Sequence, residues 1–271
     1  MAMIERLTGA IRHNRALRNA DGLWNLLRPT YNRWIGRLYG KRGLRRVINA
    51  TDEVFLSPSQ RNGSSVYEPD VWPRVMAALR EGDTFVDVGA FVGLYAVACA
   101  KRVGPRGKVV AFEPNPENLR SLREHVVLNG VEDRVEIRNE AVGAAPGTTQ
   151  IVLNGIESRI ASGDSAGFAV PLVTLDLALP EAAVHVLKVD VEGFEEHVIA
   201  GARSLLTAPG RRPRAIFVEV HPFAWQSAGT TSASMLQILR ECGYRAETLE
   251  GQPVSAIIEY GEIVAVPDHL P

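Results

Sequence analysis

The chain has 271 residues, of which 46% are hydrophobic and 23% are charged, so it can bury a large core and is not a low-complexity chain. Its two cysteines, Cys99 and Cys242, each lie in an apolar helical pattern. We therefore expect buried thiols in a reducing compartment, and no disulfide framework or metal cluster. No apolar run is long enough to span a membrane, and the first residues lack an apolar signal core, so we expect a cytoplasmic protein.

Charge is distributed unevenly along the chain. Residues 1–50 carry eleven Lys and Arg against Glu5 and Asp21, a balance of +9, whereas the remainder of the chain carries −10. This asymmetry predicts two units, a basic N-terminal extension (1–50) and a main domain (51–271). Spaced leucines predict two or three helices up to about residue 48. Three roles stay open for the extension: a helical cap or homodimer interface, a surface for an acidic partner, and a membrane-surface helix. Nucleic-acid binding is not expected, because no reader motif accompanies the arginines.

After residue 66, strand and helix patterns alternate. In chain order we expect a helix at 71–79, a strand at 84–88, a helix at 94–103, a strand at 108–113, a helix at 115–128 and a strand at 134–139. Short strands at 148–153 and 170–175, with a polar loop at 154–167 between them, predict a small β insertion. A strand at 184–189, a helix at 195–206, a strand at 215–220, a helix at 234–242 and a hairpin from 244–249 and 256–266 follow. This alternation predicts an α/β fold around a doubly wound, mostly parallel sheet.

The turn after the strand at 84–88 predicts a ligand site. Gly89 and Gly93 let a ligand approach the backbone at the start of the next helix. Asp87 would repel the pyrophosphate of a dinucleotide, and the third glycine of a dinucleotide fingerprint is missing. A carboxylate there attracts the ammonium and sulfonium groups of S-adenosylmethionine (SAM). The alternative is an ordinary turn with Asp87 as a local cap.

Glu113 ends the next strand, about twenty residues further on. An acid in this position accepts hydrogen bonds from two ribose hydroxyls, since a carboxylate has two oxygens at a suitable separation. The alternative is an acid at a helix N-terminus ahead of Pro114 and Pro116.

Polar residues also follow the other strands. Asn139-Glu140, Asp190-Val-Glu192 and Glu219-Val-His221 stand at three further strand ends. Ligands of parallel sheets bind across the carboxyl ends of the strands, so this clustering predicts an active site.

These motifs resemble the FkbM family of class I SAM-dependent methyltransferases. The resemblance rests on Phe85–Gly93, Val110–Pro116, Asn139–Gly143, Leu187–Glu195 and Phe217–His221, with Tyr67-Glu68-Pro69 upstream. It covers roughly residues 65–250 and does not extend to the basic extension. One departure is Phe91, where the family often has Asn, which puts a side-chain contact from that position in doubt.

The resemblance implies a seven-stranded Rossmann-like sheet and methyl transfer from SAM, with S-adenosylhomocysteine (SAH) as product. The implied acceptor is a hydroxyl of a sugar, glycoside or secondary metabolite such as a polyketide. The implied cofactor residues are Tyr67, Glu68, Asp87, Gly89, Ala90, Gly93, Glu113, Pro114, Glu140, Ala141 and Asp190. Tyr67 and Glu68 would close the methionine end, and Glu140 and Ala141 would lie near the adenine.

An alcohol must lose its proton as it attacks the methyl group. His221 is the first choice for the general base, because its unperturbed pKa is near neutrality, and Asp190 is the second. Alternatively, Asp190, Glu192, Glu219 and His221 bind Mg2+ or Mn2+, which lowers the pKa of the acceptor. The remaining alternative is structural: acids held at strand ends and a packed histidine. Glu157-Ser158-Arg159 lies in a polar loop that either closes over the ligands or is simply solvated.

Other functions remain open at this stage. A nucleotide-dependent oxidoreductase would share the sheet but disagrees with the glycine pattern and with Asp87. A non-catalytic SAM-binding or scaffold protein would keep the cofactor residues without the base. Lipid and peptide acceptors stay open beside sugars and secondary metabolites.

Overall fold

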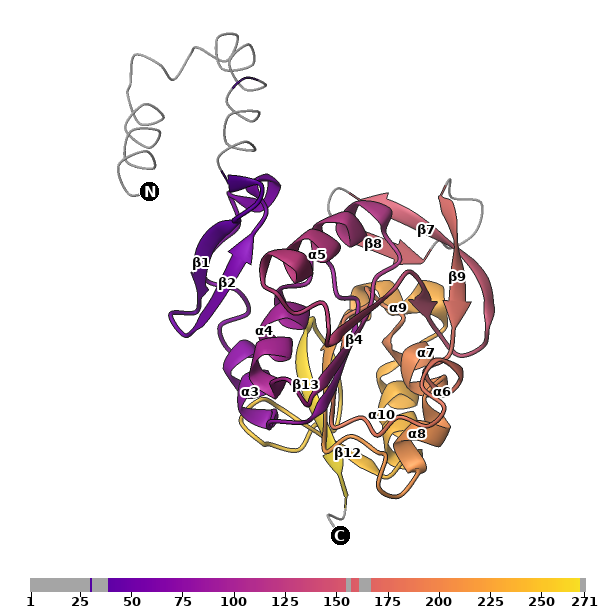
Figure 1. Ribbon diagram of the computed structural model, residues 1–271. Coiled ribbons are helices and arrows are strands. Elements are labelled where there is room, and N and C mark those ends of the chain that lie inside the picture. Colours follow the sequence, from indigo (N-terminus) through magenta and orange to yellow (C-terminus); the bar gives the residue numbers. More distant parts are fainter. Residues whose placement is uncertain (1–29, 31–38, 155–156, 161–166, 269–271) are drawn as a thin grey trace, which may run out of the picture.

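The computed structural model describes residue 30 and residues 39–154, 157–160 and 167–268 (Figure 1). Most of the basic extension, including the helices expected before residue 39, lies outside the described residues. None of the helices that are described is both long enough and apolar enough to cross a membrane.

A seven-stranded sheet forms the centre of the molecule, in the order β12-β13-β11-β10-β3-β4-β5. Its strands are β3 (Thr84–Val88), β4 (Lys108–Phe112), β5 (Val135–Arg138), β10 (Val186–Val189), β11 (Ala215–Val220), β12 (Tyr244–Glu247) and β13 (Gly261–Pro267). The pairs β10–β3, β3–β4, β4–β5 and β10–β11 are parallel, and β13 is antiparallel to both of its neighbours. The predicted doubly wound, mostly parallel sheet is confirmed.

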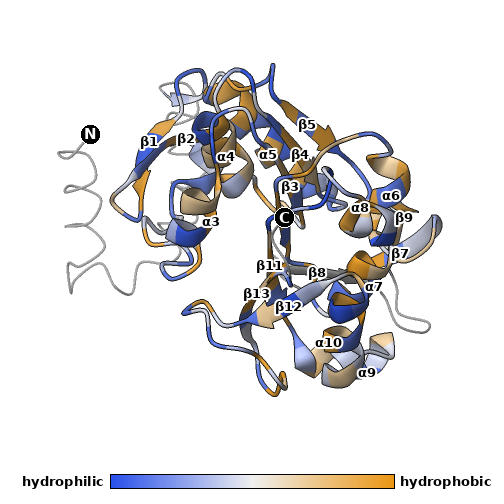
Figure 2. Cartoon of the chain, turned by 90° about the horizontal axis from the view of Figure 1, so that it is seen from below, coloured by the Kyte–Doolittle hydropathy of each residue, from blue (hydrophilic) through white to orange (hydrophobic). Residues whose placement is uncertain are grey.

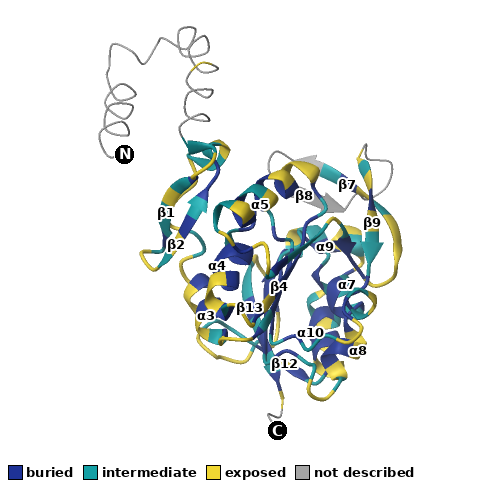
Figure 3. Ribbon diagram, in the orientation of Figure 1, coloured by how far each residue is buried: buried dark blue, intermediate teal, exposed yellow. Residues whose placement is uncertain are grey.

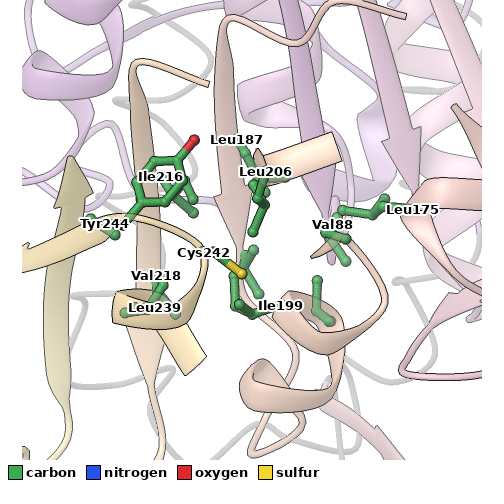
Figure 4. Packing of buried hydrophobic residues seen from close by; sticks show 14 of the residues in the cluster. Val88, Leu175, Leu187, Ile199, Leu206, Ile216, Val218, Leu239, Cys242 and Tyr244 are labelled. Atoms are coloured by element: carbon green, nitrogen blue, oxygen red, sulfur yellow. The ribbon is translucent and has the colours of Figure 1, made fainter. Parts of the chain in front are cut away.

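Helices cover both faces of this sheet. One face is covered by α3 (Trp72–Ala78), α4 (Leu94–Val103) and α5 (Pro116–Leu128), and the other by α6 (Leu175–Ala178), α7 (Glu195–Ala200), α8 (Arg203–Thr207), α9 (Pro222–Ala228) and α10 (Ser232–Glu241). Each strand alternates between the two cores: Phe85 packs with the α4 side, whereas Val86 and Val88 pack with the α7 side. Figure 4 shows this second core, and Figures 2 and 3 show that the central strands are apolar and buried.

A β-hairpin replaces the end of the predicted helical extension. β1 (Leu44–Ile48) pairs antiparallel with β2 (Asp52–Leu56), so the helical prediction is wrong for residues 44–48. The hairpin also spans the domain boundary expected at residue 50. Ile48, Val54 and Leu56 are buried in the core on the α4 side, so the hairpin is part of the main domain. A short 3-10 helix, η1 (Pro58–Gln60), follows it.

The β insertion is a four-stranded sheet in the order β6-β9-β7-β8. It consists of β6 (Ala141–Val142), β7 (Gly147–Asn154), β8 (Glu157–Ile160) and β9 (Phe168–Val173). The loop expected at 154–167 is therefore wrong in part, because Glu157-Ser158-Arg159 belongs to β8 and pairs with β7. A strand this short and polar shows little alternation of apolar and polar residues, so the sequence does not reveal it. Pairing with β7 stabilises its extended conformation.

Three helices or strands also differ from expectation. The helix expected at 195–206 is divided into α7 and α8 around Gly201, where an added Cβ would lie 2.0 Å from the Gly143 carbonyl oxygen. Glycine at this position allows the close approach of the backbone after β6, which any side chain would prevent. Helix α9 was not expected, and β13 begins at Gly261 and not at residue 256.

Asn129 connects the hairpin to the end of α5. Its Oδ1 accepts from the Phe55 N–H at 2.9 Å, and its Nδ2 donates to the Phe55 carbonyl at 2.8 Å and to the His125 carbonyl at 2.8 Å. The Asn129 side chain therefore pairs with the backbone N–H and carbonyl of Phe55 in β2, as a neighbouring strand would do.

We expect Asn129→Ala to lower the free energy of unfolding by about 1–3 kcal/mol, because partly buried peptide groups lose their partners. Urea unfolding followed by circular dichroism measures this change. Asn62→Ala, at an exposed position, is the control and should change stability by less than about 0.5 kcal/mol. Equal effects of the two substitutions would show that the connection does not stabilise the fold.

Candidate active site

A cavity of about 200 Å³ lies at the carboxyl ends of the central strands, several times the roughly 30 Å³ that one water molecule occupies. The small sheet contributes to its wall through β6 and β7. The lining residues are Tyr67, Val88, Gly89, Phe91, Phe112, Glu113, Pro114, Asn118, Glu140, Ala141, Val142, Ile151, Asp190, Val191 and Glu192. Four of these described residues are acids and none is Lys or Arg, so the wall favours cationic groups and hydroxyl donors over a phosphate.

Glu113 is held in one orientation by three donors. The backbone N–H of Phe91 donates to Oε2 at 2.8 Å, and the backbone N–H of Asn115 and the Asn118 amide donate to Oε1 at 2.8 Å and 3.3 Å. Burial raises the pKa of Glu113 to about 7, although these donors act in the opposite direction. A carboxylate has about four acceptor positions, so the described contacts leave one position, on Oε2.

The turn after β3 brings the backbone close to β10. Gly89 has φ +90°, and a Cβ there would lie 1.8 Å from the Asp190 carbonyl oxygen, so no other residue fits without moving that strand end. Gly93 has φ +84°, and a Cβ there would lie 2.1 Å from Leu122. Phe91 has φ 51° and still directs its N–H to Glu113, so its departure from the family pattern leaves this backbone contact intact.

Lys188 lies beneath the cavity with 2% of its side chain exposed. Its ammonium is 3.0 Å from Asp190 Oδ2, 3.9 Å from Glu68 Oε2 and 4.9 Å from the centre of the Tyr95 ring. Burial lowers the pKa of Lys188, but the carboxylates of Asp190, Glu68 and Asp87 outweigh burial and raise it well above its usual value. The ammonium is therefore charged.

Asp87 is adjacent to Lys188 in the register of β3 and β10. Only 1% of Asp87 is exposed, and its Oδ2 has no hydrogen-bond partner among the described residues. Burial raises the pKa of Asp87 to about 7, while the Lys188 ammonium lowers it. Asp87 is not among the lining residues, so any attraction to a cationic ligand acts through the protein and not by direct contact.

Tyr67 lines the cavity, and Glu68 lies next to it but outside the wall. The Tyr67 ring packs edge-on against Trp72 and Tyr95 at centroid distances of 6.1 Å and 6.0 Å. Glu68 accepts a hydrogen bond of 2.7 Å from the Tyr95 hydroxyl. The Arg138 guanidinium donates to Glu140 at 2.7 Å.

His221 lies behind the cavity wall and is 3% exposed. Its Nδ1 donates to Glu195 Oε1 at 2.7 Å, and its Nε2 lies 3.7 Å from Glu192 Oε2 and 3.8 Å from Glu219 Oε1. Burial lowers the pKa of His221, but the bond to Glu195 and the neighbouring acids raise it to about 9. The imidazole is therefore mostly protonated at neutral pH, which differs from the near-neutral pKa assumed from the sequence.

Glu219 and Asp190 lie next to His221. Burial and the Asp190 charge raise the pKa of Glu219 to about 7, and the Tyr260 hydroxyl donates to its Oε1. Burial would raise the pKa of Asp190, but the Lys188 ammonium holds it below its usual value. One ligand atom each of Asp190, Glu219 and His221 lie within 4.8 Å of one another.

The structure brings together part of the expected site. The cavity wall contains Tyr67, Gly89, Glu113, Pro114, Glu140, Ala141, Asp190 and Glu192. Outside the wall lie Glu68, Asp87, Ala90, Gly93, Glu219 and His221. Sequence reasoning gave no role to Asn118, Ile151 or Glu195. Asn118 is a buried polar residue in α5 and Ile151 is an apolar residue in a short strand, and neither has a distinctive signal in the sequence. Glu195 ends the Lys188–Glu195 motif, so it could have been considered as a partner for His221.

Comparison with known proteins agrees with these features. The sequence model of one protein family, the methyltransferase FkbM domain, matches residues 87–246, more than half of the chain. A stretch of 74 residues is 35% identical to the arsenite methyltransferase of Halobacterium salinarum, covering 27% of this chain and 19% of that protein. The chain thus matches about a fifth of this curated relative.

Solved structures with a similar fold include the methyltransferase FkbM of Methylobacillus flagellatus KT, with a TM-score of 0.47 and 15% identity over 69% of this chain and 44% of that chain. A SAM-dependent O-methyltransferase of Thermotoga maritima has a TM-score of 0.47 and 16% identity, over 85% of this chain and 79% of that chain. The family match includes Asp87, Glu113, Asp190 and His221. The resemblance found in the sequence is confirmed: the chain belongs to the FkbM family of methyltransferases.

Proposed function

We propose that this protein is a SAM-dependent O-methyltransferase whose acceptor is a hydroxyl group of a sugar or secondary metabolite. The observation that carries the proposal is the cavity wall, with four carboxylates, no basic residue among its described members, and Glu113 held at the end of β4. SAM bears a sulfonium, an ammonium and two ribose hydroxyls, all of which such a wall accommodates. When bound, SAM supplies an electrophilic methyl group, and the carbon–sulfur electron pair leaves with the sulfur.

The residues of this chain fit the cofactor. The Oε2 atom of Glu113 keeps one acceptor position for a ribose hydroxyl, and the adjacent Asn118 amide can exchange its 3.3 Å bond to Glu113 for a bond to the second hydroxyl. The absence of a side chain at Gly89 opens the backbone beside Asp190. Tyr67 and Asp190 would face the methionine part, with Glu140 and Ala141 near the adenine.

Removal of the acceptor proton falls to the groups beside the cavity. Asp190 and Glu192 line it, and His221 lies directly behind Glu192 and Glu219. His221 can act as a general base only when its Nε2 is free of a proton, which its carboxylate neighbours disfavour at neutral pH. Mg2+ bound by Asp190, Glu192, Glu219 and His221 would lower the pKa of the acceptor hydroxyl instead.

We keep one second candidate, a SAM-binding protein without catalysis. The cavity alone supports it equally well, because cofactor binding needs no base. The cluster of Asp190, Glu219 and His221 favours the enzyme, since titratable groups with shifted pKa values beside a cleft are typical of catalytic sites.

Glu113→Gln should weaken SAH binding about 10- to 100-fold, because hydrogen bonds to a charged acceptor contribute about 1.5–3 kcal/mol. Isothermal titration calorimetry measures the affinity, and thermal unfolding without ligand checks that the variant is folded. Glu117→Gln, exposed on the first turn of α5, four residues after Glu113, is the matched control and should bind as the native protein does. Undiminished binding by Glu113→Gln would contradict the ribose assignment, and no SAH binding by the native chain would refute the proposed function.

The affinity for 5′-methylthioadenosine should fall as the pH decreases below about 7, because the ionised form of Glu113 accepts the ribose hydrogen bonds and its pKa is raised to about 7. The expected slope is at most about tenfold per pH unit below that value, with a plateau above it. This probe contains ribose and adenine but no amino-acid group that titrates near neutrality. Calorimetry between about pH 5.5 and 8.5 measures the curve. A similar slope in Glu113→Gln would assign the titration to another residue.

A further inference from the structure

Three potential metal ligands meet where β10 and β11 end. Asp190 follows β10, Glu219 is near the end of β11 and His221 follows it, and β10 and β11 are parallel neighbours. One oxygen of each acid and one nitrogen of the imidazole lie within 4.8 Å of one another. This spacing is short enough for one ion to contact all three after small side-chain movements, since metal–oxygen distances are about 2.0–2.6 Å.

The imidazole is held ready for such an ion. Its Nδ1–H donates to Glu195 at 2.7 Å, which leaves Nε2 pointing toward Glu192 and Glu219. His221 is 3% exposed, and Nε2 has no hydrogen bond to any part of the chain that the structure describes. A ring held by one carboxylate, with its other nitrogen directed at two more, suits an ion between them once Nε2 has lost its proton.

Glu195 is itself fixed. It is fully buried, and it accepts from the Gly193 N–H on Oε1 at 2.7 Å and from the Trp225 indole N–H on Oε2 at 2.7 Å. A carboxylate with two donors besides the histidine cannot rotate away, so it fixes the ring orientation of His221. Carboxylates behind metal-bound histidines commonly have this role.

The surrounding acids also favour a cation. Glu219 is buried, with Asp190 and Glu68 nearby, and Glu262 has an oxygen that no described residue contacts by a hydrogen bond. Lys188 is the buried ammonium among these acids, and its hydrogen bond goes to Asp190. Together with the protonated imidazole of His221, it compensates part of the charge of these acids, and a divalent cation in place of the imidazole proton would compensate more of it.

We propose that Asp190, Glu219 and His221 bind a divalent cation, Mg2+ or Mn2+, and that Glu195 is the positioning residue of this site. Two carboxylates and one imidazole are a donor set of this kind, with positions left for oxygen ligands. Asp190 lines the cavity, so one of these positions is open toward a bound acceptor. The assistance given to an acceptor hydroxyl rests on the function proposed above, whereas cation binding does not.

The test uses the full chain, freed of metal with a chelator and then titrated with Mn2+, with and without SAH. The electron paramagnetic resonance signal of free Mn2+ gives the stoichiometry, and nitrogen modulation in the spin-echo signal reports an imidazole ligand. We expect one Mn2+ per chain, nitrogen modulation, and loss of this modulation in His221→Ala. Glu195→Gln should retain His221 but bind Mn2+ about 10- to 100-fold more weakly.

Two neighbouring substitutions are matched controls. Glu196→Gln and His197→Asn alter the same helix, α7, without touching His221, and should leave Mn2+ affinity unchanged. SAH calorimetry on each variant shows whether it is folded and tests the cofactor proposal separately. The cation proposal is overturned by no stoichiometric Mn2+ binding up to about 1 mM, or by nitrogen modulation that persists in His221→Ala. An unchanged Mn2+ affinity in Glu195→Gln would overturn the positioning role. Mn2+ binding without SAH binding would instead overturn the proposed function alone.

Discussion

The buried ammonium of Lys188 is the constraint on which the site depends. It lies within the central sheet, 2% exposed, and an unpaired charge there would cost several kcal/mol. Asp190 at 3.0 Å and Glu68 at 3.9 Å compensate it, and Asp87 lies beside it on β3. The ends of β3 and β10 must therefore stay aligned so that the acids remain close to the Lys188 ammonium. This explains why acids from elements far apart in the sequence converge at one edge of the sheet.

These acids outnumber the ammonium, and that excess gives the site its chemical character. The cavity wall adds Glu113 and Glu140. Anionic metabolites are repelled from such a surface, whereas sulfonium, ammonium and divalent cations are attracted. The His221–Glu195 pair lies next to these acids; burial lowers the pKa of His221, but the hydrogen bond to Glu195 and the charges of Glu195, Glu192 and Asp190 raise it to about 9. The cavity wall and the residues around His221 thus share one electrostatic environment.

The sequence predicted the central sheet well, because apolar strands such as Thr84–Val88 and Val186–Val189 alternate with helices of clear period. Cavity residues at strand ends, such as Glu113 and Asp190, followed from that topology. The β1–β2 hairpin was missed because its alternating apolar residues lie among arginines that resembled a basic helix. The pKa of His221 could not be inferred, since it depends on Glu195, whose side chain reaches it from another element.

The small sheet has a consequence for the energetics of the whole molecule. Ile151 of β7 lines the same cavity as Phe112 of β4, so a ligand that fills it touches both sheets at once. Binding then adds to the contacts that already join the small sheet to the core, where Val142 of β6 is buried. Occupancy therefore makes local opening of the small sheet more costly, and the resistance of the insertion to hydrogen exchange reports on the cavity.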